Sequence, residues 1–216
     1  MVERPTPAQV LLCLLAGGEG RRMGGQDKGL VVIQGEPLAR GVLRQLAPQA
    51  QHVLISANRN AEAYQQLWRD QGCCAPSGVQ PVFADDDDLP ARSGPLAGML
   101  SGLRRAAAQG HSWVQFAPCD TPRLPTDLTG RLLAAAEAAH ADIAVPQTQD
   151  LPDVPRPHWV CALVHTRTLP QLTAQFQTGE RKVSRWVSTH TWRSVLFEDR
   201  DAFVNFNSLE PTHASR

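Results

Sequence analysis

Two groups of residues in this 216-residue chain have the types and spacing to bind phosphate and a metal ion. The first follows an apolar run and combines two glycine pairs, Gly17–Gly18 and Gly24–Gly25, with the cations Arg21, Arg22 and Lys28. Glycines let the backbone approach a phosphate closely, and lysine and arginine can neutralise its charge. A glycine turn with solvated basic residues is the alternative interpretation.

The second group consists of aspartates that follow other apolar runs. Asp120 lies between such a run and a proline-rich turn, where a carboxylate can bind a magnesium ion that also holds substrate phosphates. A turn or helix-cap aspartate is the alternative. Asp85 is the first of four consecutive aspartates, and only this one directly follows an apolar run; such acidic stretches are most often solvated loops.

Together these residues favour phosphoryl or nucleotidyl transfer. The chain shows no evident pair of nucleophile and base, and in this chemistry positioning and charge neutralisation do most of the work. The glycine-rich stretch matches neither the Walker phosphate loop nor the dinucleotide fingerprint, since no GKS or GKT is present.

Other polar positions allow two interpretations each. Gly94 and Gly98 flank the start of an expected helix, where they could admit a ligand to the helix amides or allow close packing on the sheet. Asn205 and Asn207 lie two residues apart in an extended stretch and would share one face, as ligand contacts or as a structural pair. Cys119 is best interpreted as a small buried hydrophobe.

Apolar periodicity predicts strands alternating with helices. Strands are expected at Val10–Leu15, His52–Ala57, Gln80–Ala84, Trp113–Ala117, Asp142–Val145 and His158–His165, and helices at Leu38–Leu46, Ala61–Gln71, Pro95–Gln109, Pro125–His140, Leu169–Gln177 and Arg185–His190. Gly29–Ile33 is expected to be extended, Gln147–Pro157 a loop, and Ser194–Phe206 one or two strands.

This alternation predicts an α/β fold with a mostly parallel sheet covered by helices on both faces. We expect one domain over residues 1–216, with flexible ends at 1–9 and 211–216. Ligands of such sheets bind beyond the carboxyl ends of the strands. Gly17, Asp85 and Asp120 each follow a different predicted strand, so all three are expected to face one crevice.

Composition restricts the partners and the compartment. The 21 basic and 21 acidic side chains cancel, so no overall field attracts nucleic acid or an anionic membrane. Five cysteines without CxxC spacing argue against a disulfide framework and favour a reducing cytoplasm. No apolar run approaches the roughly 20 residues needed to span a bilayer, so we expect a soluble protein.

Four ordered motifs resemble the molybdenum cofactor guanylyltransferases, the MobA proteins. These motifs are LLAGGEGRRMGGQDKGL from Leu14, GPLAGML at Gly94–Leu100, PCDTP at Pro118–Pro122 and DAFVNFN at Asp201–Asn207, and the similarity spans Leu11 to about Glu210. The resemblance implies a Rossmann-like nucleotidyltransferase fold. It also implies Mg²⁺-dependent transfer of GMP from GTP to the terminal phosphate of molybdopterin, with release of pyrophosphate, and apo-molybdoenzymes or their chaperones as possible partners.

The resemblance also implies roles for individual residues. Arg22, Lys28 and Asp120 would be catalytic, the first two binding phosphates and Asp120 binding magnesium. The remaining positions divide into a nucleotide side, with Leu15, Ala16, Gly17, Gly18 and Asp85, and a pterin side, with Gly94, Gly98, Arg181, Asn205 and Asn207.

Departures from the family pattern leave alternatives open. Ser56 stands where relatives commonly have the first asparagine of NAN, and the loop from Asp85 to Gly94 is longer than expected. A cytidylyltransferase acting on the same pterin is one alternative, although those enzymes usually read LAAG where this chain reads LAGG. A non-catalytic carrier of the molybdenum cofactor is another, although a carrier would need neither Lys28 nor Asp120.

Overall fold

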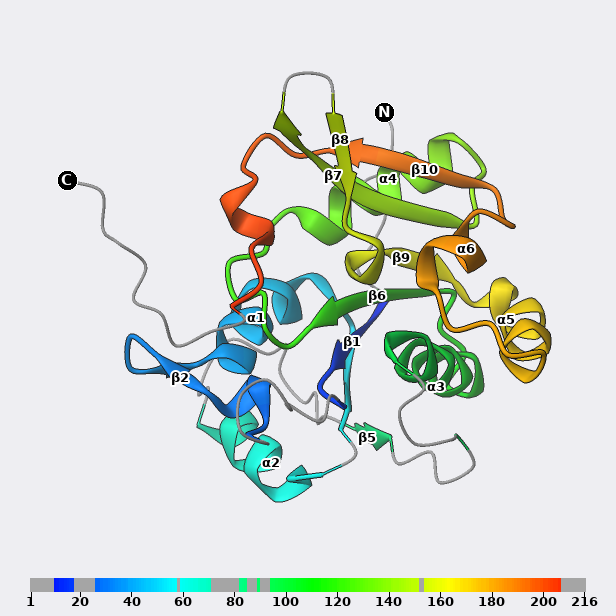
Figure 1. Cartoon of the computed structure of the whole chain (residues 1–216). Coiled ribbons are helices and arrows are strands. Elements are labelled where there is room, and N and C mark those ends of the chain that lie inside the picture. Colours follow the sequence, from blue (N-terminus) through cyan, green and yellow to red (C-terminus); the bar gives the residue numbers. More distant parts are fainter. Residues whose placement is uncertain are drawn as a thin grey trace.

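The computed structural model describes residues 10–17, 26–57, 59–70, 82–84, 89, 94–151 and 154–206. Within them, eight strands form the main sheet in the order β10-β7-β9-β6-β1-β4-β5, and β8 pairs with β7 (Figure 1). The strands are β1 (Val10–Leu15), β4 (His52–Ser56), β5 (Val82–Ala84), β6 (Trp113–Pro118), β7 (Ile143–Leu151), β8 (Val154–Pro157), β9 (Leu163–His165) and β10 (Trp192–Leu196). All are parallel except β8 and β9.

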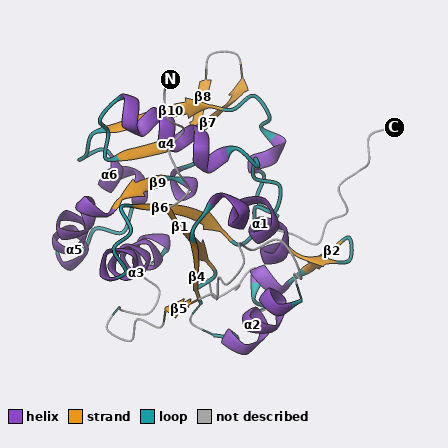
Figure 2. Cartoon of the chain, turned by 180° about the vertical axis from the view of Figure 1, so that it is seen from behind, coloured by secondary structure: helices purple, strands orange, loops and turns teal. Residues whose placement is uncertain are grey.

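Helices cover both faces of the sheet. On one face lie α1 (Leu38–Leu46), α2 (Ala61–Arg69) and α4 (Leu128–Ala138), which Figure 2 shows in front. On the other face lie α3 (Pro95–Ala108), α5 (Leu169–Gln177) and α6 (Val183–Val187). A small hairpin of β2 (Val32–Ile33) and β3 (Glu36–Pro37) stands apart. The predicted mostly parallel sheet with two helical layers is therefore confirmed.

The central strand β1 shows why its sequence is apolar throughout. Leu12 and Leu14 belong to the core beneath α1, α2 and α4, whereas Leu11 and Cys13 belong to the core beneath α3, α5 and α6. Because alternate side chains of a strand point to opposite faces, burial on both faces requires an uninterrupted apolar run.

The strand order reverses between β1 and β6. Strands β4 and β5, which follow β1 in the chain, lie on one side of it, and β6 to β10 lie on the other, in the spatial order β6, β9, β7 and β10. Leu15 at the end of β1 is in register with Pro118 at the end of β6. The segments that follow these two residues therefore leave the sheet side by side, at the position where open α/β sheets bind ligands.

The region expected to be a loop, Gln147–Pro157, is instead a β-hairpin. It is formed by the second half of β7 and by β8, with Thr148 in register with Arg156. Pro155 and Pro157 suggested a loop because proline cannot donate a ladder hydrogen bond, but β8 is an edge strand and tolerates it. The prediction of a loop was wrong because edge position is not visible in a local pattern.

Three smaller predictions also need correction. The strand expected at His158–His165 is confined to β9, after a 3-10 turn at Trp159–Cys161. In place of the extended piece at Gly29–Ile33 there is a 3-10 turn, Lys28–Leu30, before β2. Within Ser194–Phe206 the only described strand segment is the end of β10, and Asp201–Phe203 is another 3-10 turn.

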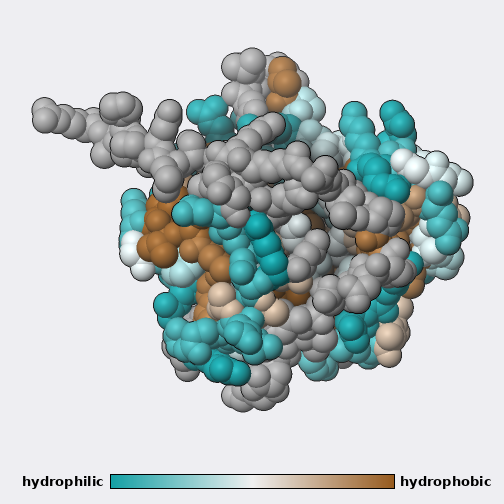
Figure 3. Space-filling model, turned by 60° about the horizontal axis from the view of Figure 1, so that its bottom comes forward, coloured by the Kyte–Doolittle hydropathy of each residue, from teal (hydrophilic) through white to brown (hydrophobic). Residues whose placement is uncertain are grey.

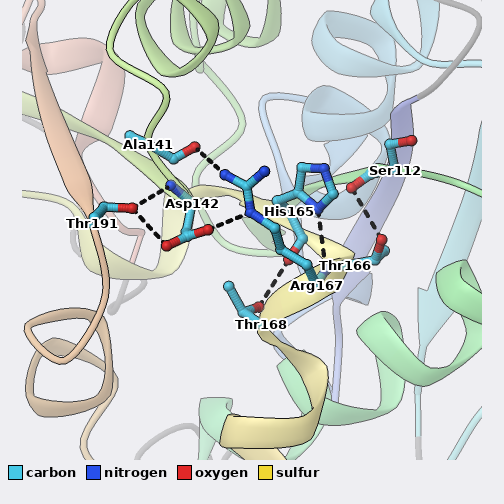
Figure 4. A network of polar contacts seen from close by, with 8 residues as sticks. All are labelled: Ser112, Ala141, Asp142, His165, Thr166, Arg167, Thr168 and Thr191. Carbon is cyan, nitrogen blue, oxygen red and sulfur yellow. Dashed lines mark hydrogen bonds and ion pairs between the residues drawn. The ribbon is translucent and has the colours of Figure 1, made fainter.

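The amino-terminal edge of the sheet is held by a polar network around Asp142, which immediately precedes β7 (Figure 4). Its carboxylate accepts a hydrogen bond from the Arg167 side chain and one of 2.6 Å from the Thr191 hydroxyl. The Arg167 guanidinium also donates to the Ala141 carbonyl at 3.3 Å. These contacts join the starts of β7 and β10 to the turn after β9.

In the view of Figure 3, hydrophilic residues cover much of the described surface, and a group of apolar residues lies at its left. Figure 1 places the β2–β3 hairpin on that side, and Val32 in this hairpin is 57% exposed. We assign this group no role. No described helix has the length and apolar character needed to cross a membrane.

Candidate active site

The two best candidate residues meet at the reversal point of the sheet. Lys28 comes from the 3-10 turn after the glycine-rich stretch, and Asp120 from the turn after β6. Lys28 Nζ lies 3.3 Å from Asp120 Oδ2, although the residues are 92 positions apart in sequence. The side chain of Asp120 is 10% exposed and that of Lys28 is 27% exposed, so both groups can still be reached by a ligand.

Backbone hydrogen bonds continue the sheet into this site. The amide of Cys119 donates to the Leu15 carbonyl at 3.1 Å, and the amide of Ala16 donates to the Ser56 carbonyl at 2.8 Å. Leu15 and Ala16 are therefore fixed between the ends of β4 and β6, and Gly17 follows directly. The structure thus brings Leu15, Ala16, Gly17, Lys28 and Asp120 to one edge. Of the three residues predicted to face one crevice, Gly17 and Asp120 lie at this edge, and Asp85 is outside the described residues.

The carboxylate of Asp120 is the kind of oxygen ligand that magnesium uses in proteins. Among the described residues no group of three or more histidine, cysteine or acidic side chains could enclose a metal ion. Magnesium is commonly held by only one or two carboxylates together with substrate phosphates and water. Asp120, with Lys28 beside it for the phosphates, fits that kind of site.

The segment after β10 returns to this site. The Thr121 hydroxyl donates to Asn205 Oδ1 at 2.9 Å, and the amide of Phe206 donates to the Asp120 carbonyl at 2.9 Å. Asn205 itself is exposed. The structure therefore supports a place for Asn205 near the reacting groups, and its predicted contact with a pterin stays a prediction.

The start of α3 packs over the ends of two strands. A Cβ atom added to Gly98 would lie 2.8 Å from Leu15 Cδ2 and 3.3 Å from Ser56 Oγ. Close packing, one of the two interpretations of Gly98, is therefore present. Gly94 precedes the helix with φ of 69°, in the region that favours glycine.

Arg181 lies apart from the Lys28–Asp120 pair. Its guanidinium stacks over the Phe176 ring at 3.9 Å and donates to the carbonyls of Phe176 and Glu180 at 2.7 Å. It lines a cavity of about 270 Å³ between α3 and α5. The described contacts give Arg181 a structural role beside these helices, and its predicted contact with a pterin is untested.

A larger cavity of about 430 Å³ lies between the loop after Asp120 and the segment after β10. Two arginines line it, and both already have partners. Arg131 stacks on Phe197 at 3.9 Å and donates to the Leu196 carbonyl at 2.6 Å, while Arg123 lies over Phe206. Since acidic side chains also line this cavity, we do not assign it as a phosphate site.

Cys119 is not available as a nucleophile. Burial, followed by the nearby negative charges of Asp120 and Asp27, raises the pKa of its thiol to about 12. The thiol therefore stays protonated at neutral pH, and only the thiolate is strongly nucleophilic. This agrees with the interpretation of Cys119 as a small buried residue.

Sequence reasoning missed Asp27 and Tyr64, which contact each other beside Lys28 through a hydrogen bond of 2.5 Å. Asp27 directly precedes Lys28, and Tyr64 is the only tyrosine in the chain, but no spacing rule connects the two. Four predicted site residues, Gly18, Arg22, Asp85 and Asn207, lie outside the described part of the chain, and their roles stay predictions.

Comparison with known proteins identifies close relatives. A family model described as the MobA-like NTP transferase domain matches residues 12–195. The chain is 45% identical to a molybdenum cofactor guanylyltransferase of Burkholderia ambifaria over 96% of this chain and 95% of that protein. A protein of the same name in Cupriavidus necator is 42% identical over 94% and 95% of the two chains.

Solved structures show the same fold. Molybdopterin-guanine dinucleotide biosynthesis protein A from Archaeoglobus fulgidus superimposes with a TM-score of 0.65 at 21% identity, covering 92% of this chain and 93% of that one. At this identity the similarity establishes the fold alone.

Proposed function

This chain belongs to the family of MobA-like NTP transferase domains, and from that membership we propose that it transfers GMP from GTP to the terminal phosphate of molybdopterin. The products would be pyrophosphate and the guanine dinucleotide form of the molybdenum cofactor. Relatives that are more than 40% identical over about 95% of the chain carry the name molybdenum cofactor guanylyltransferase. We further propose that the reaction takes place in the cytoplasm.

The observation that carries this proposal is the Lys28–Asp120 pair at the reversal point of the sheet. In the proposed reaction an oxygen of the pterin phosphate attacks the α-phosphorus of GTP. The bond from that phosphorus to the bridging oxygen breaks, and pyrophosphate leaves. Because the attacking phosphate is already ionised, no protein base is needed.

The residues of the pair have complementary tasks in this proposal. Asp120 would hold Mg²⁺, which supplies positive charge to the phosphates when bound. Lys28 would move from Asp120 to the phosphates of GTP and neutralise charge that builds on the leaving pyrophosphate. Arg22, from the stretch outside the described residues, would assist Lys28.

The proposed choice of guanine rests on the opening loop and on the relatives. The LAGG string at Leu15–Gly18 differs from the LAAG that cytidylyltransferases usually have, and the relatives named above are guanylyltransferases. Leu15 ends β1 and Ala16 follows it directly, at the edge of the sheet where a nucleotide base would bind. The Ser56 carbonyl accepts a hydrogen bond from the Ala16 amide, and the residue is only 6% exposed.

Turnover with defined nucleotides tests the proposal. Purified protein is incubated with molybdopterin, Mg²⁺ and each nucleoside triphosphate in turn, and pyrophosphate is measured. We expect release with GTP and loss of that release when Mg²⁺ is chelated. Release with CTP alone would identify a cytidylyltransferase. No release with any nucleotide, together with binding of the molybdenum cofactor, would instead indicate a carrier.

A further inference from the structure

The residue before Lys28 is a buried carboxylate that the proposed reaction does not use. Asp27 is 7% exposed. Its Oδ1 accepts hydrogen bonds from the Tyr64 hydroxyl at 2.5 Å and from the Gly29 amide at 3.2 Å, and its Oδ2 accepts from Asn60 Nδ2 at 3.2 Å. A buried carboxylate is costly unless such donors surround it. We call these four residues the Asp27 network.

The network fixes the backbone on both sides of Lys28. Before Lys28, Asp27 is attached to Asn60 and Tyr64, which lie just before α2 and in its first turn. After Lys28, a Cβ atom added to Gly29 would lie 2.4 Å from the Tyr64 hydroxyl oxygen and 3.1 Å from Cys119 Cβ. Gly29 is therefore packed against the residue that precedes Asp120.

This packing fixes the position of the Lys28 main chain relative to Asp120. The main chain of Lys28 is held against α2 by Asp27 and against the end of β6 by Gly29. The side chain of Lys28, which is 27% exposed, is the part left able to move between Asp120 and a phosphate. Because the main chain at Lys28 is already fixed, less entropy is lost when its side chain binds a phosphate.

Tyr64 is suited to act as a permanent donor. The residue is fully buried, and burial, followed by the nearby Cys119 and Asp27, strongly raises the pKa of its hydroxyl. The hydroxyl therefore stays protonated near neutral pH and donates to Asp27, which can only accept while it is ionised.

We propose that Asp27, held by Tyr64 and Asn60, is a positioning residue that places Lys28 for binding the phosphates of the nucleotide. The inference rests on the proposed function for the identity of those phosphates. The alternative is that Asp27 only caps the 3-10 turn through the Gly29 amide. A cap would contribute stability alone, whereas a positioning residue acts on phosphate binding through Lys28.

The first test replaces Tyr64 with phenylalanine, which removes one hydroxyl and keeps the ring that fills the core. Binding of pyrophosphate in the presence of Mg²⁺ is measured by calorimetry, because this probe reports on Lys28 without a base or a pterin. We expect Tyr64→Phe to weaken binding about tenfold, the equivalent of one hydrogen bond to a charged group. Thr168→Val is the matched control, since it also removes one buried hydroxyl, whose bond to His165 lies at the opposite edge.

The second test separates positioning from stability. If Tyr64 acts through Lys28, Tyr64→Phe should change pyrophosphate binding by less than about twofold in a Lys28→Ala background, because the residue that it positions is absent. An unchanged tenfold effect in that background would overturn the inference, and so would wild-type binding by Tyr64→Phe alone.

A rescue experiment guards against simple misfolding. Asp27→Asn places an amide against the Asn60 amide and should weaken pyrophosphate binding. Adding Asn60→Asp reverses the original pair, so that the new amide at position 27 donates to the new carboxylate at position 60. We expect pyrophosphate binding by this double variant to recover within about threefold of the wild type. Failure of the double variant to recover, while its unfolding temperature does, would also overturn the inference.

The experiments distinguish a failure of the positioning role from a failure of the proposed function. If the chain binds pyrophosphate in the expected pattern but releases none from GTP, the proposed function fails and the positioning role stands. If wild-type protein with GMP-transfer activity does not bind pyrophosphate, Lys28 is not a phosphate residue and the positioning role fails.

Discussion

Each edge of the sheet has a pair of opposite charges, and the two pairs differ in what surrounds them. At the amino-terminal edge, Asp142 accepts from both Arg167 and Thr191, and the pKa of its carboxyl is lowered because these hydrogen bonds outweigh the opposing effect of burial. At the carboxyl-terminal edge, the Asp120 carboxylate pairs with Lys28 at the longer distance of 3.3 Å.

The difference shows how one sheet separates stability from binding. The Asp142 pair joins β7, β10 and the turn after β9, and its acceptor atoms are used within the protein (Figure 4). The Lys28–Asp120 pair joins two segments that leave the sheet where the strand order reverses, which is where ligands of such sheets bind. We therefore expect substitutions at the two edges to have opposite effects on turnover and on stability.

The largest expected effect is loss of turnover in Lys28→Ala and Asp120→Ala. Each should lower the rate of pyrophosphate release from GTP by about 10³-fold or more, because each removes charge stabilisation of the transferred group. Unfolding temperature and circular dichroism should stay close to those of the wild type. Wild-type turnover in either variant would show that our assignment of its role is wrong.

The reverse pattern is expected for Asp142→Ala. Removing the carboxylate takes two hydrogen bonds from the amino-terminal edge and should lower the free energy of unfolding by about 1–2 kcal/mol, a figure reduced because Arg167 is half exposed. Turnover well below the unfolding temperature should be unchanged. Urea denaturation measures the free energy of unfolding, and a turnover assay measures the activity. A tenfold loss of turnover in Asp142→Ala would show that the amino-terminal edge also contributes to activity.

A smaller effect is expected at the helix that covers the carboxyl-terminal edge. In Gly98→Ala the added methyl group must displace the end of the Leu15 side chain, so we expect a loss of about 1 kcal/mol together with a raised KM for GTP. Gly130→Ala in α4 is the matched control, since its added Cβ meets no atom within 4 Å. Gly130→Ala should be as stable as the wild type or more stable, because alanine favours a helix more than glycine does. Equal stability and equal KM for GTP in Gly98→Ala and Gly130→Ala would argue against close packing at Gly98.

The smallest expected effect is a pH dependence of stability at the amino-terminal edge. Burial, and then the neighbouring His52, lowers the pKa of His111 below its usual 6.5. The unfolded chain therefore takes up a proton at higher pH than the folded chain. Stability is full above about pH 6.5 and falls as the pH drops toward the lower, folded pKa.

Urea denaturation between pH 7.5 and 5.5 measures this dependence. His111→Gln, which cannot titrate, should show a flatter profile over the same range, although burial of His165 lowers that residue's pKa also and leaves part of the slope. Identical slopes for the variant and the wild type would show that His111 does not contribute.

Much of the architecture could be predicted from the sequence because it depends on local patterns. The apolar run of β1, the face of α1 and the proline and glycine at the start of α3 each lie within a few residues of each other. The β7–β8 hairpin could not be predicted, because the prolines in β8 are acceptable only on an edge strand. The position of β8 in the sheet depends on the whole fold.

The candidate site divides in the same way. The sequence by itself determined which residues could bind phosphate and metal, since glycine, lysine and aspartate at strand ends have that chemistry wherever they lie. Only the tertiary structure decided that Lys28 contacts Asp120 across 92 residues, and that Asp27 and Tyr64 hold the backbone beside it. Such contacts depend on strand order, register and the packing of α2, because these bring distant segments of the chain together at the carboxyl-terminal edge.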